Sequence, residues 1–299
     1  MGARPLIAVF GGSGFLGRFI VRRLAEAGMD VRVVARNPAT ISAGEASGRI
    51  ESRAADINNE AAVRAALDGT DGAVNAVSLY VETRHARFDA VHVDGAERLA
   101  RLTGEAGLRT LVHISGIGVD TASPSAYVRA RARGEDAVRA AFPAAVILRP
   151  SVIFGPGDAF LSTLASIARA PVIPLFGAGR MQLQPVHVDD VARAVVRAVD
   201  EPATRGRVFE LGGAEILSYR EILQAVLEHS GRRRPLLPVP FPVWHLIATL
   251  AAVLPQPPLT RDQLILMKAD NTVRPDAATF RDLDITPRAL TTELGNCLS

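Results

Sequence analysis

The chain has 299 residues, enough for one large domain or two smaller ones, and its 48% hydrophobic content is typical of a globular protein. A formal net charge of only +3, with no basic stripe interleaved with aromatic residues, excludes a typical nucleic-acid-binding protein. The single cysteine, Cys297, excludes an internal disulfide framework and favours a reducing compartment. No apolar run reaches membrane-spanning length, and the first strand begins too early for a secretory signal, so we expect a cytoplasmic protein.

A glycine-rich turn near the N-terminus predicts a dinucleotide-binding site. It follows the apolar run 6–9, a predicted strand, and opens a segment with apolar residues at helical spacing. In such a unit the first glycine permits the tight turn, the second lets the phosphates approach the backbone, and the third lets the helix pack on the strand. Free amide groups at the helix N-terminus then bind the pyrophosphate. The residues assigned to this role are Gly11, Gly12, Ser13, Gly14, Phe15, Leu16 and Gly17.

The end of the predicted second strand, residues 31–35, bears on which nucleotide is bound. An NAD-binding unit usually places a carboxylate there, on the adenosine ribose hydroxyls. This chain has Arg36 and Asn37 instead, and a guanidinium suits a 2′-phosphate. We therefore expect NADP(H) rather than NAD(H) as the cofactor.

Strands and helices alternate up to about residue 155. Strands are predicted near 49–55, 73–78, 111–115 and 145–148, and helices at 59–67, 84–106 and 125–142. This alternation predicts an α/β fold, a Rossmann-type doubly wound parallel sheet. The ends of the strands are expected to contact the cofactor, through Asp56, Ile57, Asn75, Ala76 and Val77. Asp56 could equally cap the helix that follows it.

The rhythm breaks after residue 155, which predicts two domains. Residues 1–155 form the NADP-binding domain, to which the chain returns around 186–212, and residues 156–299 form a smaller C-terminal domain. Asp189 and Asp190 resemble a carboxylate pair, but adjacent residues at a helix start point apart, so a helix N-cap is expected. The six histidines lack ligand spacing, and we expect no metal. Ser218 and Glu221 predict a capping box.

The apolar segment 243–254 lies in a proline-rich stretch and follows three arginines at 232–234. Twelve residues span ~18 Å, too short to cross a bilayer. Burial in the core is the default expectation. The arginines and the lone Trp244 leave open a membrane surface, at the inner face of the membrane, or a protein partner, contacted through Arg232–Leu254.

Five motifs together resemble the short-chain dehydrogenases/reductases, specifically their extended or atypical branch, over nearly the whole chain. The motifs are the turn Gly11–Gly17, Ser115, the pair Tyr127 and Arg131, Arg149–Pro156 and Pro185–Ala192. Within that branch the chain looks most like the dehydrogenase-like accessory subunit of respiratory complex I and its bacterial relatives. The shared phrases are 123–127, 147–151 and 254–260.

The resemblance implies that Tyr127 is the acid/base, that Ser115 polarises the substrate oxygen, and that both line the nicotinamide pocket with Arg131. It also implies cofactor contacts from Pro150, Ser151, Val152 and Ile153. In active members of the family a lysine stands where this chain has Arg131, and the only lysine here, Lys268, is far along the chain. An arginine supplies the charge, but with a pKa above ~12 it cannot pass a proton along.

Three functions follow from this resemblance. The first is a stably bound NADP(H) with little turnover, linked to respiratory complex I or quinone metabolism. The second is an active NADPH-dependent reductase of an apolar carbonyl or quinone-like substrate. The third and weakest is a nucleotide-sugar epimerase or dehydratase, which would need more polar contacts in the C-terminal domain.

Overall fold

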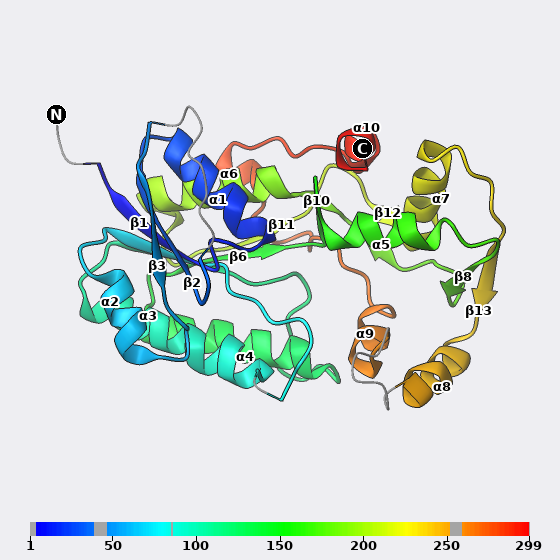
Figure 1. The fold of residues 1–299 in the computed structure, drawn as a ribbon, viewed down its shortest axis with the longest axis horizontal. Helices are drawn as coiled ribbons and strands as arrows, with labels where there is room; N and C mark the ends of the chain where they lie inside the picture. The colour runs from blue at the N-terminus through cyan, green and yellow to red at the C-terminus, as the bar shows by residue number, and fades with distance from the viewer. Residues whose placement is uncertain (1–3, 39–46, 85, 252–258, 299) are drawn as a thin grey trace.

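A seven-stranded parallel sheet forms the centre of the computed structural model, which describes residues 4–38, 47–84, 86–251 and 259–298 (Figure 1). The strand order is β11-β6-β5-β4-β1-β2-β3, and all neighbouring strands are parallel. This order confirms the predicted α/β doubly wound sheet of Rossmann type. The strands are β1 (Leu6–Phe10), β2 (Asp30–Ala35), β3 (Ile50–Ala54), β4 (Gly72–Asn75), β5 (Thr110–Ile114), β6 (Val146–Pro150) and β11 (Val208–Leu211).

Helices cover both faces of this sheet, as Figure 1 shows. On one face lie α1 (Phe15–Glu26) and α6 (Val188–Asp200), and on the other α2 (Glu60–Leu67), α3 (Gly95–Glu105) and α4 (Ala126–Ala141). Each face has its own hydrophobic core, one around Leu24 and Val195, the other around Leu99 and Val138. Because both faces are covered, the central strands are apolar throughout.

The strand order reverses between β1 and β4, where successive connections leave for opposite sides of the sheet. In doubly wound sheets the crevice at this reversal, outside the carboxyl ends of the strands, is where ligands bind. The glycine turn and the ends of β4, β5 and β6 therefore converge on one edge.

Two boundaries differ from the sequence prediction. Strand β4 ends at Asn75 rather than at residue 78, because the Asn75 side chain accepts a hydrogen bond from the amide of Val77 and turns the chain. The helix expected from residue 84 begins at Phe88, and its first part, Ala90–Asp94, is a π-helical turn that leads into α3. Gly134 of α4 packs against this turn at the carbonyl of His92, where a Cβ would not fit.

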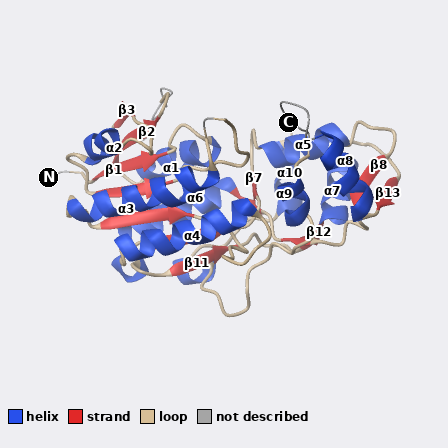
Figure 2. Ribbon diagram, turned by 90° about the horizontal axis from the view of Figure 1, so that it is seen from below, coloured by secondary structure: helices blue, strands red, loops and turns tan. Residues whose placement is uncertain are grey.

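Most residues after β6 form a separate lobe beside the sheet (Figure 2). It has its own hydrophobic core, around Leu175, Leu223 and Leu290. Its elements are β7 (Ile153–Phe154), α5 (Ala159–Ile167), β8 (Ile173–Phe176), β9 (Gln182–Leu183), β10 (Val186–His187), β12 (Leu217–Ser218), α7 (Tyr219–His229), β13 (Leu236–Val239), α8 (Phe241–Ala251), α9 (Arg261–Leu266) and α10 (Leu290–Cys297). The division at residue 155 into two domains stays a prediction.

Helix α8 contradicts the expectation of core burial for residues 243–254. Only Ala248 is buried in it, and Leu246 and Leu250 are 60% and 66% exposed. Trp244 points inward instead, and its Nε1 donates to the carbonyl of Leu175 (3.0 Å). Leu254 lies outside the described residues. Within the described chain, no helix is long and apolar enough to cross a membrane.

Candidate nucleotide and catalytic site

The turn between β1 and α1 brings backbone against backbone. Gly11 has φ of 78°, and a Cβ there would lie 2.7 Å from the carbonyl oxygen of Ala76. A Cβ on Gly17 would overlap the carbonyl of Gly11. The Gly11 amide donates to the carbonyl of Val34 in β2 (2.8 Å). The turn, the end of β2 and the end of β4 therefore meet, and only glycine fits at either position.

The start of α1 is suited to an anion. Its N-cap residue, Gly14, offers no side-chain cap, and the first turn carries no acidic residue. Unpaired amide groups and the positive end of the helix dipole remain available there. Together with the close approach of Gly11 to Ala76, this cradle fits the pyrophosphate of a dinucleotide, held by Gly11–Gly17.

Arg36 is the first residue after β2, two positions beyond the carbonyl that binds the glycine turn. Its side chain is exposed and has no ion-pair partner among the described residues. Asp56, after β3, accepts a hydrogen bond from the amide of Asn58 (2.9 Å). The cap of α2 is Asn59, whose side chain accepts from Ala62, so the alternative role of Asp56 as that cap is wrong. Ile57 is buried beside it.

Asn75 faces into the protein. Its Nδ2 donates to Nδ1 of His113 (3.1 Å), and its Oδ1 accepts from the Val77 amide (3.2 Å). Burial, with the Arg131 cation nearby, lowers the pKa of His113 to about 3, so the imidazole is neutral and Nδ1 accepts. Asn75 shapes the edge of the sheet, and the backbone of Ala76 and Val77 faces the glycine turn.

Tyr127 and Arg131 lie one turn apart on α4. Arg131 Nη1 donates to the Tyr127 hydroxyl (3.1 Å) and to Ser78 Oγ (3.2 Å), and Nη2 donates to the carbonyl of Ile114 (3.2 Å). The guanidinium is buried, and its Nε has no partner in the described chain. The sequence did not indicate Ser78. Arg131 is therefore held by three protein acceptors.

The ring of Tyr127 lies among aromatic side chains. Tyr80 stacks on it with centroids 5.8 Å apart, and Phe88 and His92 meet it edge-on, each at 5.6 Å. Loss of water around the phenol raises the pKa of Tyr127, and the Arg131 cation only partly offsets this. At neutral pH the hydroxyl stays protonated.

Ser115 follows β5 directly, next to the carbonyl that Arg131 binds. It is 3% exposed, and its Oγ has no hydrogen-bond partner among the described residues. A buried hydroxyl without a partner is costly, and such a group commonly awaits a ligand. The structure thus gathers Ser115, Tyr127 and Arg131 at the carboxyl edge of the sheet.

Residues after β6 reach the same edge through Asn271, which the sequence did not indicate. Its Oδ1 accepts from Ser151 Oγ (2.6 Å) and the Val152 amide (3.1 Å), and its Nδ2 donates to the carbonyl of Ile117 (3.3 Å). The amide of Ile117 donates in turn to Pro150 (3.1 Å). The side chain of Ser151 is thereby occupied, and Ile153 pairs in the small sheet β10-β7.

A second residue from the C-terminal lobe holds the start of α4. Asp262 of α9 accepts from Ser125 Oγ (2.7 Å) and from the Ala126 amide (2.8 Å). Ser125 is the N-cap of α4 and accepts from the Val128 amide. The helix that carries Tyr127 and Arg131 is therefore capped across the two lobes.

The N-cap role expected for Asp189 and Asp190 is wrong, because His187 caps α6 through its Nδ1. Asp189 instead receives Arg23 of α1 through two hydrogen bonds (2.6 and 2.5 Å) and Arg288 (2.7 Å). Burial opposes its charge, but the two arginines hold the pKa of Asp189 below its usual range. In the described residues no group of three His, Cys, Asp or Glu side chains is placed to bind a metal.

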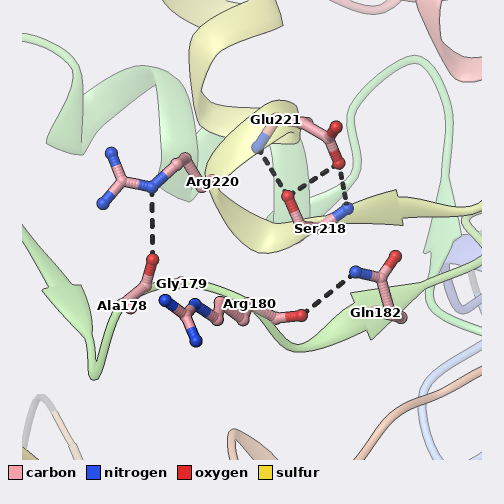
Figure 3. Close-up of a pocket in the computed structure, with 7 residues that line it drawn as sticks. All are labelled: Ala178, Gly179, Arg180, Gln182, Ser218, Arg220 and Glu221. Atoms are coloured by element: carbon pink, nitrogen blue, oxygen red, sulfur yellow. Dashed lines mark hydrogen bonds between the residues drawn. The ribbon is translucent and has the colours of Figure 1, made fainter.

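The capping box predicted for Ser218 and Glu221 is confirmed at the start of α7. It borders a pocket of about 420 Å³ in the C-terminal lobe (Figure 3). Arg220 narrows the pocket, and its Nε donates to the carbonyl of Ala178 (3.2 Å). The lining residues are Ala178, Gly179, Arg180, Gln182, Ser218, Arg220 and Glu221. None of the predicted site residues is among them.

The mitochondrial NADH dehydrogenase [ubiquinone] 1 alpha subcomplex subunit 9 of Arabidopsis thaliana is 30% identical over 298 residues, covering 94% of this chain and 74% of that protein. A ceramide reductase of Caulobacter vibrioides is 30% identical over 248 residues, covering 80% and 75%. These similarities confirm the resemblance stated from the motifs.

Among solved structures, gox2253 superposes with a TM-score of 0.76 at 20% identity, covering 99% of this chain and 97% of the other. This agreement supports the fold alone. A family model described as the NAD dependent epimerase/dehydratase family matches residues 7–212. The chain belongs to the NAD dependent epimerase/dehydratase family, and its homologues include subunits of mitochondrial NADH dehydrogenase.

Proposed function

We propose that this protein holds NADP(H) with little turnover and serves respiratory complex I or quinone metabolism. The observation that carries the proposal is Arg131, which stands beside the Tyr127 hydroxyl and is bound by three protein acceptors. Arginine stays charged at every working pH and cannot relay a proton. Tyr127 also keeps a raised pKa despite this cation. A proton transfer through this pair is therefore slow.

The preference for NADP(H) is supported by Arg36. Its exposed guanidinium follows β2, where NAD-binding members of such folds usually carry a carboxylate. Gly11–Gly17 would hold the pyrophosphate, and Arg36 the 2′-phosphate. A bound nicotinamide cofactor would supply a hydride, and the residues nearest that chemistry are Ser115 and Tyr127.

The respiratory link is supported by the relatives, several of which are named as subunits of NADH dehydrogenase or NADH-ubiquinone oxidoreductase. Each of these three matches more than nine-tenths of this chain, including the C-terminal lobe. We therefore propose a cytoplasmic protein that acts beside a respiratory complex.

The cofactor assignment is tested by titrating the purified protein with NADPH and NADH. We expect tighter binding of NADPH, and loss of that preference in Arg36→Ala. The variant Arg53→Ala removes another exposed arginine, on the neighbouring strand β3, and serves as the matched control. Equal affinities for the two nucleotides in the native protein would refute NADP(H).

A second candidate function is an NADPH-dependent reductase of an apolar carbonyl or quinone-like substrate. It is favoured by the buried, unpartnered Oγ of Ser115, which could donate to a substrate oxygen. In that reaction a hydride from NADPH would add to the carbonyl carbon, and the Tyr127 hydroxyl would give its proton to the oxygen. The ceramide reductase relative is consistent with such an activity.

Arg131→Lys separates the two candidates. A lysine would restore the residue that active family members use, so a low-turnover protein should gain NADPH oxidation with a quinone panel. If the native protein already oxidises NADPH at an ordinary enzymatic rate, about 10 s⁻¹, and the substitution slows it, the reductase is the correct function.

A further inference from the structure

Helix α8 exposes an apolar stripe on the outside of the C-terminal lobe. Val243, Leu246, Ile247 and Leu250 are 44%, 60%, 42% and 66% exposed. Their spacing of i, i+3, i+4 and i+7 places them within an arc of about 100° on one side of the helix. This is the spacing of a core-facing stripe, but here it faces away from the protein. Leu237 of the preceding strand β13 is 54% exposed as well.

The opposite side fastens α8 to the lobe. Trp244 donates to Leu175 and packs on Phe176 with ring centroids 4.5 Å apart, and Ala248 is fully buried. On the flank, Arg261 Nη2 donates to Thr249 Oγ1 (3.1 Å), and Lys268 Nζ lies 3.0 Å from His245 Nε2. These contacts fix the orientation of the helix, so the stripe is a built surface.

The charge around the stripe has one sign. No Asp or Glu occurs from residue 229 to residue 261, although the chain has 31 acidic residues. Arg261 and Lys268 flank α8 directly. Arg233 and Arg234 are exposed at the far end of β13 and have no ion-pair partner among the described residues.

We propose that α8 docks this protein on the surface of an anionic lipid bilayer. The helix would lie in the interface plane, with Val243, Leu246, Ile247 and Leu250 among the acyl chains and the cations on the headgroups. The stripe and Leu237 offer on the order of a few hundred Å², less than one side of a stable protein interface, about 800 Å². A bilayer needs no larger matching surface, and its anionic lipids match the absence of carboxylates.

The test is flotation of the full chain with vesicles of phosphatidylcholine alone and of phosphatidylcholine mixed with phosphatidylglycerol. We expect flotation with the anionic vesicles only, weakened by salt. Leu246→Asp with Leu250→Asp should lower the partition coefficient at least about tenfold. Arg233→Glu with Arg234→Glu should lower it on anionic vesicles. Ile216→Asp, at an exposed apolar residue outside the stripe, should not change it.

Nucleotide binding by each variant verifies its fold, since α8 contributes no residue to the candidate nucleotide site. The proposal is overturned if the native protein floats with neither vesicle, or if the leucine double variant floats as well as the native protein. It is overturned in favour of a second copy if light scattering shows a dimer that the leucine substitutions dissociate. These results are independent of NADPH turnover, so they do not bear on the proposed function.

Discussion

The glycine turn and the Tyr127 pocket occupy the same edge of the sheet but are built from different materials. At the turn the contacts are backbone on backbone: Gly11 approaches Ala76, and Gly17 approaches Gly11. At Tyr127 the contacts are between side chains, with Arg131 held by Ser78 and by the carbonyl of Ile114. The turn can therefore bind a nucleotide whatever stands at position 131. Binding and turnover are separable in this protein, and the predictions below test that separation.

The largest effect is expected at the turn, from Gly17→Ala. The new Cβ would overlap the Gly11 carbonyl, so the turn must open, and NADPH affinity should fall by about 100-fold or more, ~3 kcal/mol. The measurement is a fluorescence titration. The matched control is Gly104→Ala in α3, where the added Cβ would meet Phe142 at an ordinary 3.5 Å. Native-like affinity in folded Gly17→Ala would contradict the assignment of the turn.

The sheet edge itself should be sensitive to acid through His113. Burial lowers its folded-state pKa to about 3, while the unfolded chain binds the proton near 6.5. The unfolded state therefore binds more protons as the pH falls below 6.5, and stability is lost progressively down to about pH 3. Between about pH 7 and pH 5 this one histidine should remove about 2 kcal/mol of unfolding free energy.

Urea denaturation at the two pH values measures this loss. His113→Asn lacks the titrating group, and the pH dependence should become smaller by that amount. His229→Asn, at an exposed histidine at the end of α7, is the control and should leave the dependence unchanged. An unaltered dependence in His113→Asn would show that the imidazole is not held neutral.

The smallest effect is expected at the start of α4. Asp262→Ala removes the carboxylate that accepts from Ser125 and Ala126, and the unfolding free energy should fall by about 1 kcal/mol. Nucleotide affinity should stay within about twofold of the native value, because the turn is not touched. Asp276→Ala, at an exposed aspartate, is the control. Equal stability of the two variants would mean that the cap contributes nothing.

Local rules in the sequence predicted the fold and the turn well. Strand, glycines and helix are adjacent in the chain, so the β1–α1 unit and the sheet followed from short stretches. Ser125 as the start of a helix followed in the same way. The capping box of α7 is also local, since Ser218 and Glu221 are three residues apart.

The errors arise where distant residues compete for the same group. Asp189 was expected to cap α6, but Arg23 and Arg288, far away in sequence, bind its carboxylate and leave the cap to His187. Asn271 and Asp262 reach the candidate site from 119 or more residues away in sequence. For α8, the periodicity of the stripe was correct in form, but hydrophobicity alone does not say which side of a helix meets the protein.

The central claim, a nucleotide bound but hardly used, is tested most directly by the lifetime of bound NADPH. One equivalent is bound to the native protein and to Arg131→Lys, a quinone acceptor is added, and NADPH fluorescence is followed in a stopped-flow instrument. The account predicts a signal that persists in the native protein and decays at least about tenfold faster in Arg131→Lys. Rapid decay in the native protein, slowed by the substitution, would contradict it.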